Sequence, residues 1–377
     1  MNVEDFFSKF RKRITFNYDR FKLFFDVNQL IFSSIYVDKG TLHLLNSFRK
    51  TCNVNYGRIL DVGCGYGSIG IYLKKKYFDS YVECVDRDAL SLEFCQHNAI
   101  LNNCNINVHP SLGYNSVDGK FDLICSNYPA KAGKNALKDF VYNASRFLEK
   151  DGVLAIVIVK ELVEDFKDIL KDEIQIIYEE ASSGHVVYHI KFSDVLNFDE
   201  NNYSRGNNEF IIGNEKYILD CAYNIAEFED ISFSSCAIIE ILKNLSTKKI
   251  DVIRPFQGYL PLAISYYLKP EKINLISRDL LSLTFSSKNL ETFGFKNIRI
   301  FHQFLSDNRK GELLVWNVDK ELEFEQFKFE IAMVLKNFDT VVIGGKKSKL
   351  MRFMKDSGID YSKKIEIKNA VALILKS

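Results

Sequence analysis

The sequence predicts an α/β protein with doubly wound parallel sheets, arranged as two similar halves in tandem. Apolar segments rich in β-branched residues alternate with segments of helical periodicity, which is typical of strands joined by crossover helices. A strand at Arg58–Val62 runs into a glycine-rich turn and a helix, the opening unit of such a sheet. The segment Arg87–Phe94 recurs as Arg278–Phe285, a displacement of 278 − 87 = 191 residues, which indicates an internal repeat.

Length and composition indicate the number of domains and the kind of protein. A chain of 377 residues exceeds a typical single core, so two domains are expected. The net charge of +1 gives no strong global field for nucleic acid, so any basic surface must be local. The eight cysteines form no CxxC pair, and we find neither a secretory leader nor an apolar run of membrane length. We therefore expect a reduced, cytoplasmic protein, monomeric, with no metal site and no membrane contact.

The elements of the first half follow in order. Ser68 is expected to cap the helix that begins after the glycine turn. The expected strands are Ile14–Asn17, Phe21–Phe25, Arg58–Val62, Ser80–Val85, Ile106–His109, Phe121–Ser126, Gly152–Val159, Ile174–Glu179 and Val186–Phe192. The other expected helices are Asp38–Phe48, Ala89–Asn102, Phe140–Leu148 and Glu161–Lys171.

The predicted domains are residues 1–195, a polar linker over 196–208 and a second domain over 209–377. In the second half, Arg254–Tyr259 replaces the acid and most of the glycines of the first turn, and Ser277 stands where the first half has Asp86. Asn317 is kept without the proline that follows its counterpart. We expect this half to have lost the chemistry of the first.

The glycine turn indicates the charge of its ligand. Gly63, Gly65 and Gly67 alternate, which lets the backbone turn sharply and approach a ligand without a Cβ in the way. Asp61, two residues earlier, would sit badly beside the diphosphate of a dinucleotide. It suits S-adenosylmethionine, which carries an ammonium and a sulfonium. The alternative is a turn that only packs a helix on a strand.

Two further strand ends carry polar groups. Asp86 ends the second strand, where a ribose diol can be held by two hydrogen bonds. Asn127, at the end of the fourth, is followed by Tyr128 and the stiffening Pro129. The Asn127 amide oxygen and the Tyr128 carbonyl are acceptors that suit a planar amine, whose lone pair they would direct at a methyl group. The alternative is a turn asparagine that satisfies its own backbone.

These segments resemble a known family. Asp61–Gly67, Val85-Asp86 and Ser126–Lys134 are similar to class I S-adenosylmethionine-dependent methyltransferases, and with Phe32–Thr41 to the "methyltransferase small" group, which includes ribosomal RNA guanine-N2 methyltransferases. The resemblance covers Phe16–Phe192. It implies two tandem Rossmann-like class I methyltransferase folds, with the N-terminal copy active and the C-terminal copy degenerate. In the family's ribosomal enzymes the active copy comes second, whereas here it comes first.

The resemblance also implies roles for single residues. It assigns Asp61, Gly63 and Gly65 to the methionine end of the cofactor, Asp86 to the ribose, Arg87 to the vicinity of the adenine, and Asn127 with Pro129 to the target amine. Cys64 and Asn127 are also expected to contact the cofactor. The loop departs from the usual Asn-Pro-Pro-aromatic pattern, which leaves Tyr128 as the candidate stacking ring. Leu112 stands where the family often has an acid.

The expected function is methyl transfer to an exocyclic base amine of RNA, guanine N2 of ribosomal RNA and, by preference, of the small subunit. The base must be unpaired or splayed out to be reached. Candidate phosphate contacts are Arg11, Arg13, Lys131 and Lys134. The near-zero net charge favours a structured partner such as an assembled ribosomal subunit. The alternatives are methylation of a protein glutamine amide and a non-catalytic module that only binds the cofactor.

Overall fold

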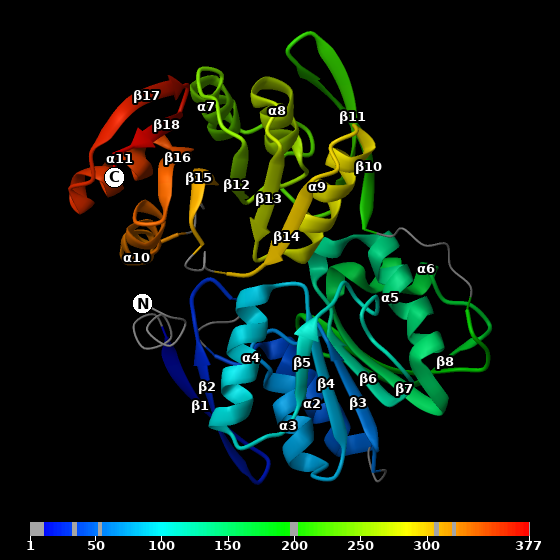
Figure 1. The fold of residues 1–377 in the computed structure, drawn as a ribbon. Coiled ribbons are helices and arrows are strands. Elements are labelled where there is room, and N and C mark those ends of the chain that lie inside the picture. Colours follow the sequence, from blue (N-terminus) through cyan, green and yellow to red (C-terminus); the bar gives the residue numbers. More distant parts are fainter. Residues whose placement is uncertain are drawn as a thin grey trace. The chain divides into compact units, whose positions relative to one another are not determined.

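The computed structural model describes residues 11–31, 36–51, 55–196, 203–304, 309–318 and 322–376. Within these ranges no helix is long and apolar enough to cross a membrane. The chain divides into two compact units: the first ends at Tyr203 and the second begins at Ser204 (Figure 1). The division falls inside the predicted linker, whose last residues, from Ser204, form the start of a strand, β10 (Ser204–Ile212).

The first unit is built on a seven-stranded sheet of order β5-β4-β3-β6-β7-β9-β8. All strand pairs are parallel except those of β9, which runs antiparallel to β7 and to β8. The strands are β3 (Arg58–Val62), β4 (Tyr81–Asp86), β5 (Asn107–Pro110), β6 (Phe121–Asn127), β7 (Leu148–Val159), β8 (Ile174–Ala181) and β9 (His185–Phe192). Because β3 is central and the chain winds outward from it in both directions, the fold is the predicted doubly wound type.

The helices of the first unit fall into two groups (Figure 1). In one group α3 contacts both α2 and α4, and in the other α5 contacts α6. The helices are α2 (Lys39–Thr51), α3 (Ser68–Lys76), α4 (Ala89–Leu101), α5 (Lys134–Phe147) and α6 (Val163–Asp168), with the short 3-10 turns η1 (Ala130–Ala132) and η2 (Lys160–Leu162). Buried apolar side chains of α5 and of the sheet form one continuous core cluster.

Each strand predicted for the first half is present, with ends that differ by a few residues. The prediction that Ser68 caps its helix is wrong: the N-cap of α3 is Gly67, with φ at 90° and no side-chain cap bond. Helix α5 begins at Lys134, well before the predicted Phe140, because the chain turns into it directly at Gly133. The predicted helix Glu161–Lys171 is shorter and is preceded by η2.

A β-hairpin of β1 (Lys12–Tyr18) and β2 (Phe21–Val27) is tied to α4 and to the glycine turn by one buried side chain. The Asn98 amide accepts a hydrogen bond from the backbone N–H of Asp26 at 2.7 Å and donates to the carbonyl of Asp26 at 3.0 Å. It also donates to the carbonyl of Tyr66, inside the glycine turn, at 3.0 Å. We call this arrangement the Asn98 clamp. It fixes the turn against α4 without any ligand.

The second unit repeats the strand order of the first, as β14-β13-β12-β15-β16-β18-β17. Again the last two strands form the antiparallel end of an otherwise parallel sheet. Its elements are β10, β11 (Glu215–Ala222), α7 (Phe233–Leu242), β12 (Lys249–Ile253), α8 (Tyr259–Leu268), β13 (Lys272–Ser277), α9 (Leu280–Thr292), β14 (Ile298–His302), β15 (Gly311–Asn317), α10 (Phe324–Leu335), β16 (Phe338–Lys346), α11 (Lys347–Ser357), β17 (Tyr361–Ile367) and β18 (Ala370–Leu375).

The two units also share local detail at the turn after the central strand. Arg254 and Phe256, each displaced by 191 residues (254 − 63 and 256 − 65), have the left-handed backbone of Gly63 and Gly65, with φ of 63° and 52° against 74° and 55°. The clamp recurs with Asn289, whose amide accepts from the backbone N–H of Asp220 at 3.0 Å and donates to the carbonyls of Asp220 and Gln257 at 2.8 Å each. The backbone therefore has the same left-handed conformation at these positions of both units, although only the first unit has glycines there.

Candidate functional site

Asp61 is the most deeply placed polar group at the carboxyl edge of the first sheet. It pairs in register with Cys84 of β4 and Cys125 of β6, and it is fully buried. One carboxylate oxygen, Oδ2, accepts the backbone N–H of Gly70 at 2.9 Å, whereas Oδ1 is buried without a donor among the described residues. Burial raises the pKa of the Asp61 carboxyl well above its usual value. A ligand that brings N–H donors and positive charge would satisfy this oxygen.

The glycine turn leaves room for such a ligand. A Cβ built on Gly65 would meet no atom within 4 Å, and one built on Gly63 only the Ser126 hydroxyl at 4.0 Å, among the described residues. The N–H groups of Gly63 and Cys64 donate to the carbonyl of Val85 at 2.8 and 3.0 Å, which anchors the turn to β4. The turn is thus held open by the sheet, and its backbone borders free space.

Asp86 occupies the end of β4, beside the turn. Its two carboxylate oxygens accept the backbone N–H groups of Gly65 and Asp88, each at 2.9 Å. Burial raises the pKa of the Asp86 carboxyl to about 6, and the positive charge of Arg87 acts weakly in the opposite direction. A carboxylate at this place can accept further hydrogen bonds from ligand hydroxyls, because each oxygen has more than one lone pair.

Asn127 ends β6, the strand on the other side of β3. Its amide nitrogen donates to the Asp38 carboxylate at 2.9 Å and to the Thr41 hydroxyl at 3.1 Å. The chain then bends at Pro129, with φ at −72°, into η1. The strand end and the proline together fix where the amide oxygen and the following carbonyl lie.

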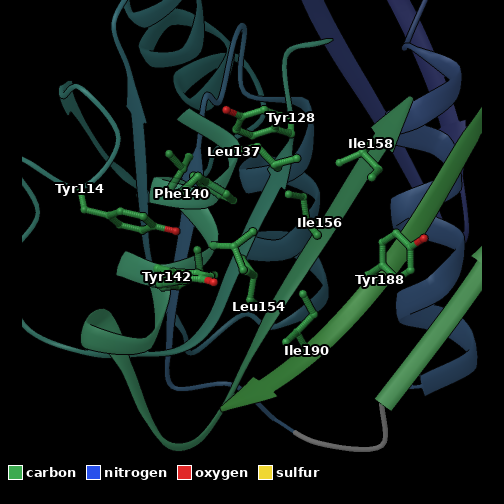
Figure 2. Close-up of a cluster of buried hydrophobic side chains, with 14 of the residues drawn as sticks. Tyr114, Tyr128, Leu137, Phe140, Tyr142, Leu154, Ile156, Ile158, Tyr188 and Ile190 are labelled. Carbon is green, nitrogen blue, oxygen red and sulfur yellow. The ribbon is translucent and has the colours of Figure 1, made fainter. Parts of the chain in front are cut away.

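The suggestion that Tyr128 supplies a stacking ring is wrong. Its side chain is only 6% exposed and belongs to the apolar core, with its ring centroid 5.3 Å from that of Phe140 (Figure 2). Burial raises the pKa of the Tyr128 phenol well above its ordinary value. Only the backbone of Tyr128 is therefore available for the chemistry that the sequence predicts.

The four predicted phosphate contacts lie in different surroundings. Arg11 and Arg13 form ion pairs with the buried carboxylate of Asp26, at 3.0 and 2.7 Å, while each keeps part of its side chain exposed. Lys134 pairs with Asp168 at 2.7 Å. Lys131, in η1 just after the proline, is exposed.

The structure brings Asp61, Asp86 and Asn127 together at the ends of β3, β4 and β6, which are neighbours in the sheet. Sequence reasoning missed Asp38 and Thr41, which contact Asn127 directly. Asp38 is the first residue of a predicted helix and directly precedes α2 in the structure, the place of a capping side chain. Nothing in the sequence connects that cap to a strand end 89 residues away. In the described part of the chain no group of three or more His, Cys, Asp or Glu side chains is arranged to hold a metal ion.

A doubly wound sheet with a reversed last strand, an acid before a glycine turn, a second acid at the next strand and an asparagine-proline strand end define a domain of the class I methyltransferase type. Residues 22–189 match the family described as methyltransferase small domain. This part of the chain is similar to that family.

Curated relatives match about a third of the chain. The ribosomal RNA small subunit methyltransferase C of Shewanella sediminis is 36% identical over 136 residues, covering 35% of this chain and 38% of that protein. The protein of the same name from Actinobacillus pleuropneumoniae serotype 3 is 34% identical over 131 residues, covering 34% of this chain and 40% of that protein. The matched segment thus spans about two fifths of the length of these relatives.

One solved structure matches both units. It is the T. thermophilus 16S rRNA N2 G1207 methyltransferase in complex with AdoMet and guanosine, with a TM-score of 0.72 and 14% identity, covering 97% of this chain and 98% of that chain. At this identity the likeness shows the fold alone.

Proposed function

We propose that the chain transfers a methyl group from S-adenosylmethionine to an exocyclic amine of an RNA base, and that the base is guanine, modified at N2, in ribosomal RNA of the small subunit. The proposal rests on two groups at neighbouring strand ends. Asp61 of β3 is a buried carboxylate with one oxygen that has no donor among the described residues, and Asn127 of the adjacent β6 is an amide fixed by hydrogen bonds. The names of the curated relatives and of the structural neighbour support the same substrate.

The residues present fit the cofactor. Asp61 would accept the ammonium group through its unpartnered oxygen, the turn at Gly63–Gly65 would lie against the ligand, and Asp86 would accept the ribose hydroxyls. When bound, the cofactor supplies an electrophilic methyl group on a sulfonium. No charged protein group needs to take part in a covalent step.

The protein's own contribution to the reaction is to place the amine. The Asn127 amide oxygen and the Tyr128 carbonyl would accept its two N–H groups and so direct the nitrogen lone pair at the methyl carbon. The same acceptors stabilise the positive charge that develops on the nitrogen. Lys131, which is exposed next to Pro129, and the partly exposed Arg11 and Arg13 would contact phosphates.

We also propose that the second unit is a degenerate copy of the first, so that the chain arose by tandem duplication. The shared strand order, the left-handed Arg254 and Phe256, and the recurrent clamp support this origin. At displacement 191, Val252 stands for Asp61 and Ser277 for Asp86 (252 − 61 and 277 − 86). The second unit therefore lacks the two carboxylates that would hold the cationic ligand in the first.

The test is transfer of labelled methyl from S-adenosylmethionine to unmodified small ribosomal subunits, to naked ribosomal RNA and to a protein with an exposed glutamine, in parallel. Digestion of the product identifies the modified nucleoside. We expect label on N2-methylguanosine. Label on protein alone would replace the proposal with amide methylation, and label on neither would leave a cofactor-binding module.

The second arm of the test is Asn127→Ala. If the amide places the amine, kcat falls on the order of 100-fold or more while cofactor affinity changes little. Full activity of this variant would contradict the proposed role of Asn127.

A further inference from the structure

The Asn127 side chain is held entirely from its nitrogen side. Its Nδ2 has two hydrogens, and both are used, one on the Asp38 carboxylate at 2.9 Å and one on the Thr41 hydroxyl at 3.1 Å. A carboxylate can only accept hydrogen bonds, so the amide cannot turn round without placing two acceptors against each other. The amide oxygen, Oδ1, must therefore face away from Asp38.

Asp38 is itself fixed by the start of helix α2. The same oxygen that receives Asn127, Oδ2, also accepts the backbone N–H groups of Gly40 at 2.7 Å and Thr41 at 3.2 Å. Thr41 is 4% exposed, so its hydroxyl has little freedom to leave the contact. The helix cap and the orientation of the Asn127 amide are consequently one hydrogen-bonded unit.

The second unit shows the same contact with one decisive difference. Its strand-end asparagine, Asn317, donates to the Ser235 hydroxyl at 3.0 Å, as Asn127 does to Thr41. However, the Ser234 hydroxyl donates to the Asn317 amide oxygen, also at 3.0 Å. Asn317 thus has a hydroxyl partner on its oxygen as well as on its nitrogen, and it is 3% exposed.

Ser234 has a counterpart in the first unit that explains the difference. The caps Asp38 and Ser232 are displaced by 232 − 38 = 194 residues, and the same displacement relates Thr41 to Ser235 and Gly40 to Ser234. In the first unit, the position that closes the amide oxygen of the second therefore carries no side chain at all.

We propose that Asp38 and Thr41 are positioning residues that aim the Asn127 amide oxygen at the target amine, and that Gly40 keeps this oxygen open. The inference rests on the proposed function, because it assigns these residues to the orientation of the amine acceptor. It goes beyond that function, since it explains why one strand-end asparagine can act and the other cannot.

The first experiment removes the Asp38 carboxylate and the Thr41 hydroxyl while keeping the helix cap. In the double variant Asp38→Ser/Thr41→Val, the serine can cap α2 as Ser232 caps α7, and the valine offers no acceptor. The serine oxygen is shorter-reaching, is used by the cap and carries a hydrogen, so it no longer fixes the Asn127 amide as the carboxylate does. We expect kcat for small-subunit RNA to fall on the order of 100-fold, with the dissociation constant for S-adenosylmethionine changed less than about twofold. Thr41→Ser, which keeps the hydroxyl, should retain nearly full activity.

The second experiment uses two matched substitutions at Gly40 to test whether the Asn127 amide oxygen must stay open. Gly40→Ala and Gly40→Ser place the same Cβ, which meets Asp38 Oδ2 at 2.9 Å and the His185 ring at 3.0 Å, so both variants bear the same crowding. Only serine adds the hydroxyl that Ser234 uses. We expect the kcat of Gly40→Ser to fall at least about tenfold below that of Gly40→Ala. Asp279→Asn, a cap change on α9 of the second unit, is the control expected to leave kcat unchanged.

The outcomes separate the two proposals. If Asn127→Ala abolishes transfer while the double variant keeps wild-type kcat, the positioning role is wrong and the proposed function stands. If the double variant loses cofactor affinity or thermal stability in step with kcat, Asp38 and Thr41 are merely structural and the inference is again overturned. If the wild-type chain transfers no methyl group to any RNA, the proposed function itself is wrong.

Discussion

At the scale of single residues, the site is defined by two carboxylates, of which Asp61 has one oxygen without a hydrogen-bond donor among the described residues. Asp61 is fully buried with only one of its oxygens bonded, and burial is the main cause that raises the pKa of its carboxyl well above the usual value. Burying such a group lowers the stability of the folded chain, and a cation that binds it offsets this loss. Binding of the ligand therefore also favours the ionised form of the Asp61 carboxyl.

The first prediction is that cofactor affinity depends on pH. Asp86 has a pKa of about 6, so its carboxyl gains a proton as the pH falls through this value and then presents a donor where the ribose needs an acceptor. The raised pKa of Asp61 acts in the same direction. Calorimetric titration with S-adenosylmethionine from about pH 5 to about pH 8 should show affinity rising with pH. Asp86→Asn should bind more weakly and lose the step near pH 6; a flat profile in the wild type would contradict the prediction.

The sequence predicts the acids and the asparagine of the site because their spacing around one glycine turn has a chemical reason. It does not predict that the Tyr128 ring is buried, because spacing along the chain does not show that helix α5 packs Phe140 against this ring. The role of Gly40 cannot be predicted from the sequence either, because it depends on the position of the Asn127 amide oxygen in the folded chain.

At the scale of elements, the turn is positioned by what packs behind it. The Asn98 clamp satisfies both backbone groups of Asp26 and the carbonyl of Tyr66 from one fully buried side chain. Asn289 makes the equivalent three bonds in the second unit. Asn98 and Asn289 can therefore be compared directly, because they make the same hydrogen bonds but only the unit of Asn98 is expected to bind the cofactor.

The second prediction uses that pair. Asn98→Ala and Asn289→Ala should each lower the free energy of unfolding of their own unit by about 2 kcal/mol or more, because buried backbone groups lose their partners. Only Asn98→Ala should also weaken the binding of S-adenosylmethionine, since Tyr66 lies within the turn. Urea unfolding and calorimetric titration measure the two effects. Equal cofactor affinity in both variants would show that the clamp does not position the turn.

The third prediction concerns the packing of α2 on the sheet. His189 of β9 is 2% exposed, lies 2.7 Å from the Ser47 hydroxyl of α2, and has a pKa lowered to about 4 by burial. The unfolded chain binds a proton near the ordinary value of about 6.5, so stability is complete above that pH and is lost as the pH falls toward 4.

Between about pH 7.5 and pH 5 this group should remove about 2 kcal/mol from the free energy of unfolding of the first unit. Urea unfolding at the two pH values checks the difference. His189→Gln, which cannot ionise, should have lower stability at neutral pH but a shallower pH dependence. An unchanged slope in this variant would assign the acid sensitivity to other groups.

At the scale of the whole molecule, two units share one strand order and differ in the groups at the carboxyl edges of their sheets. The similarity of the two units is visible in the sequence at Arg87–Phe94 and Arg278–Phe285, because both segments carry the same helix cap and a similar apolar face. The boundary between the units was less visible, since β10 begins inside a segment whose polar composition is typical of a linker. A hairpin strand that is half exposed needs few apolar residues.

The fourth prediction is the number of cofactor sites. The second unit has Val252 and Ser277 in place of the two acids, so the chain should bind one molecule of S-adenosylmethionine. Calorimetric titration of the full chain gives the stoichiometry directly. Asp61→Ala should abolish all binding heat, which shows that the single site is in the first unit. Two equivalents per chain in the wild type would contradict the loss of the second site.

The left-handed backbone of Arg254 and Phe256 has a consequence for how a ligand would enter the first unit. Residues with a Cβ adopt this conformation at a cost of about 1 kcal/mol or more each, and nevertheless the curve of the chain is the same as at Gly63 and Gly65. The shape of the turn must then come from the strand before it and the helix after it, and the glycines serve to leave space for a ligand. A turn made in this way has its final shape before a ligand binds, so association should be quick and require almost no rearrangement of the main chain.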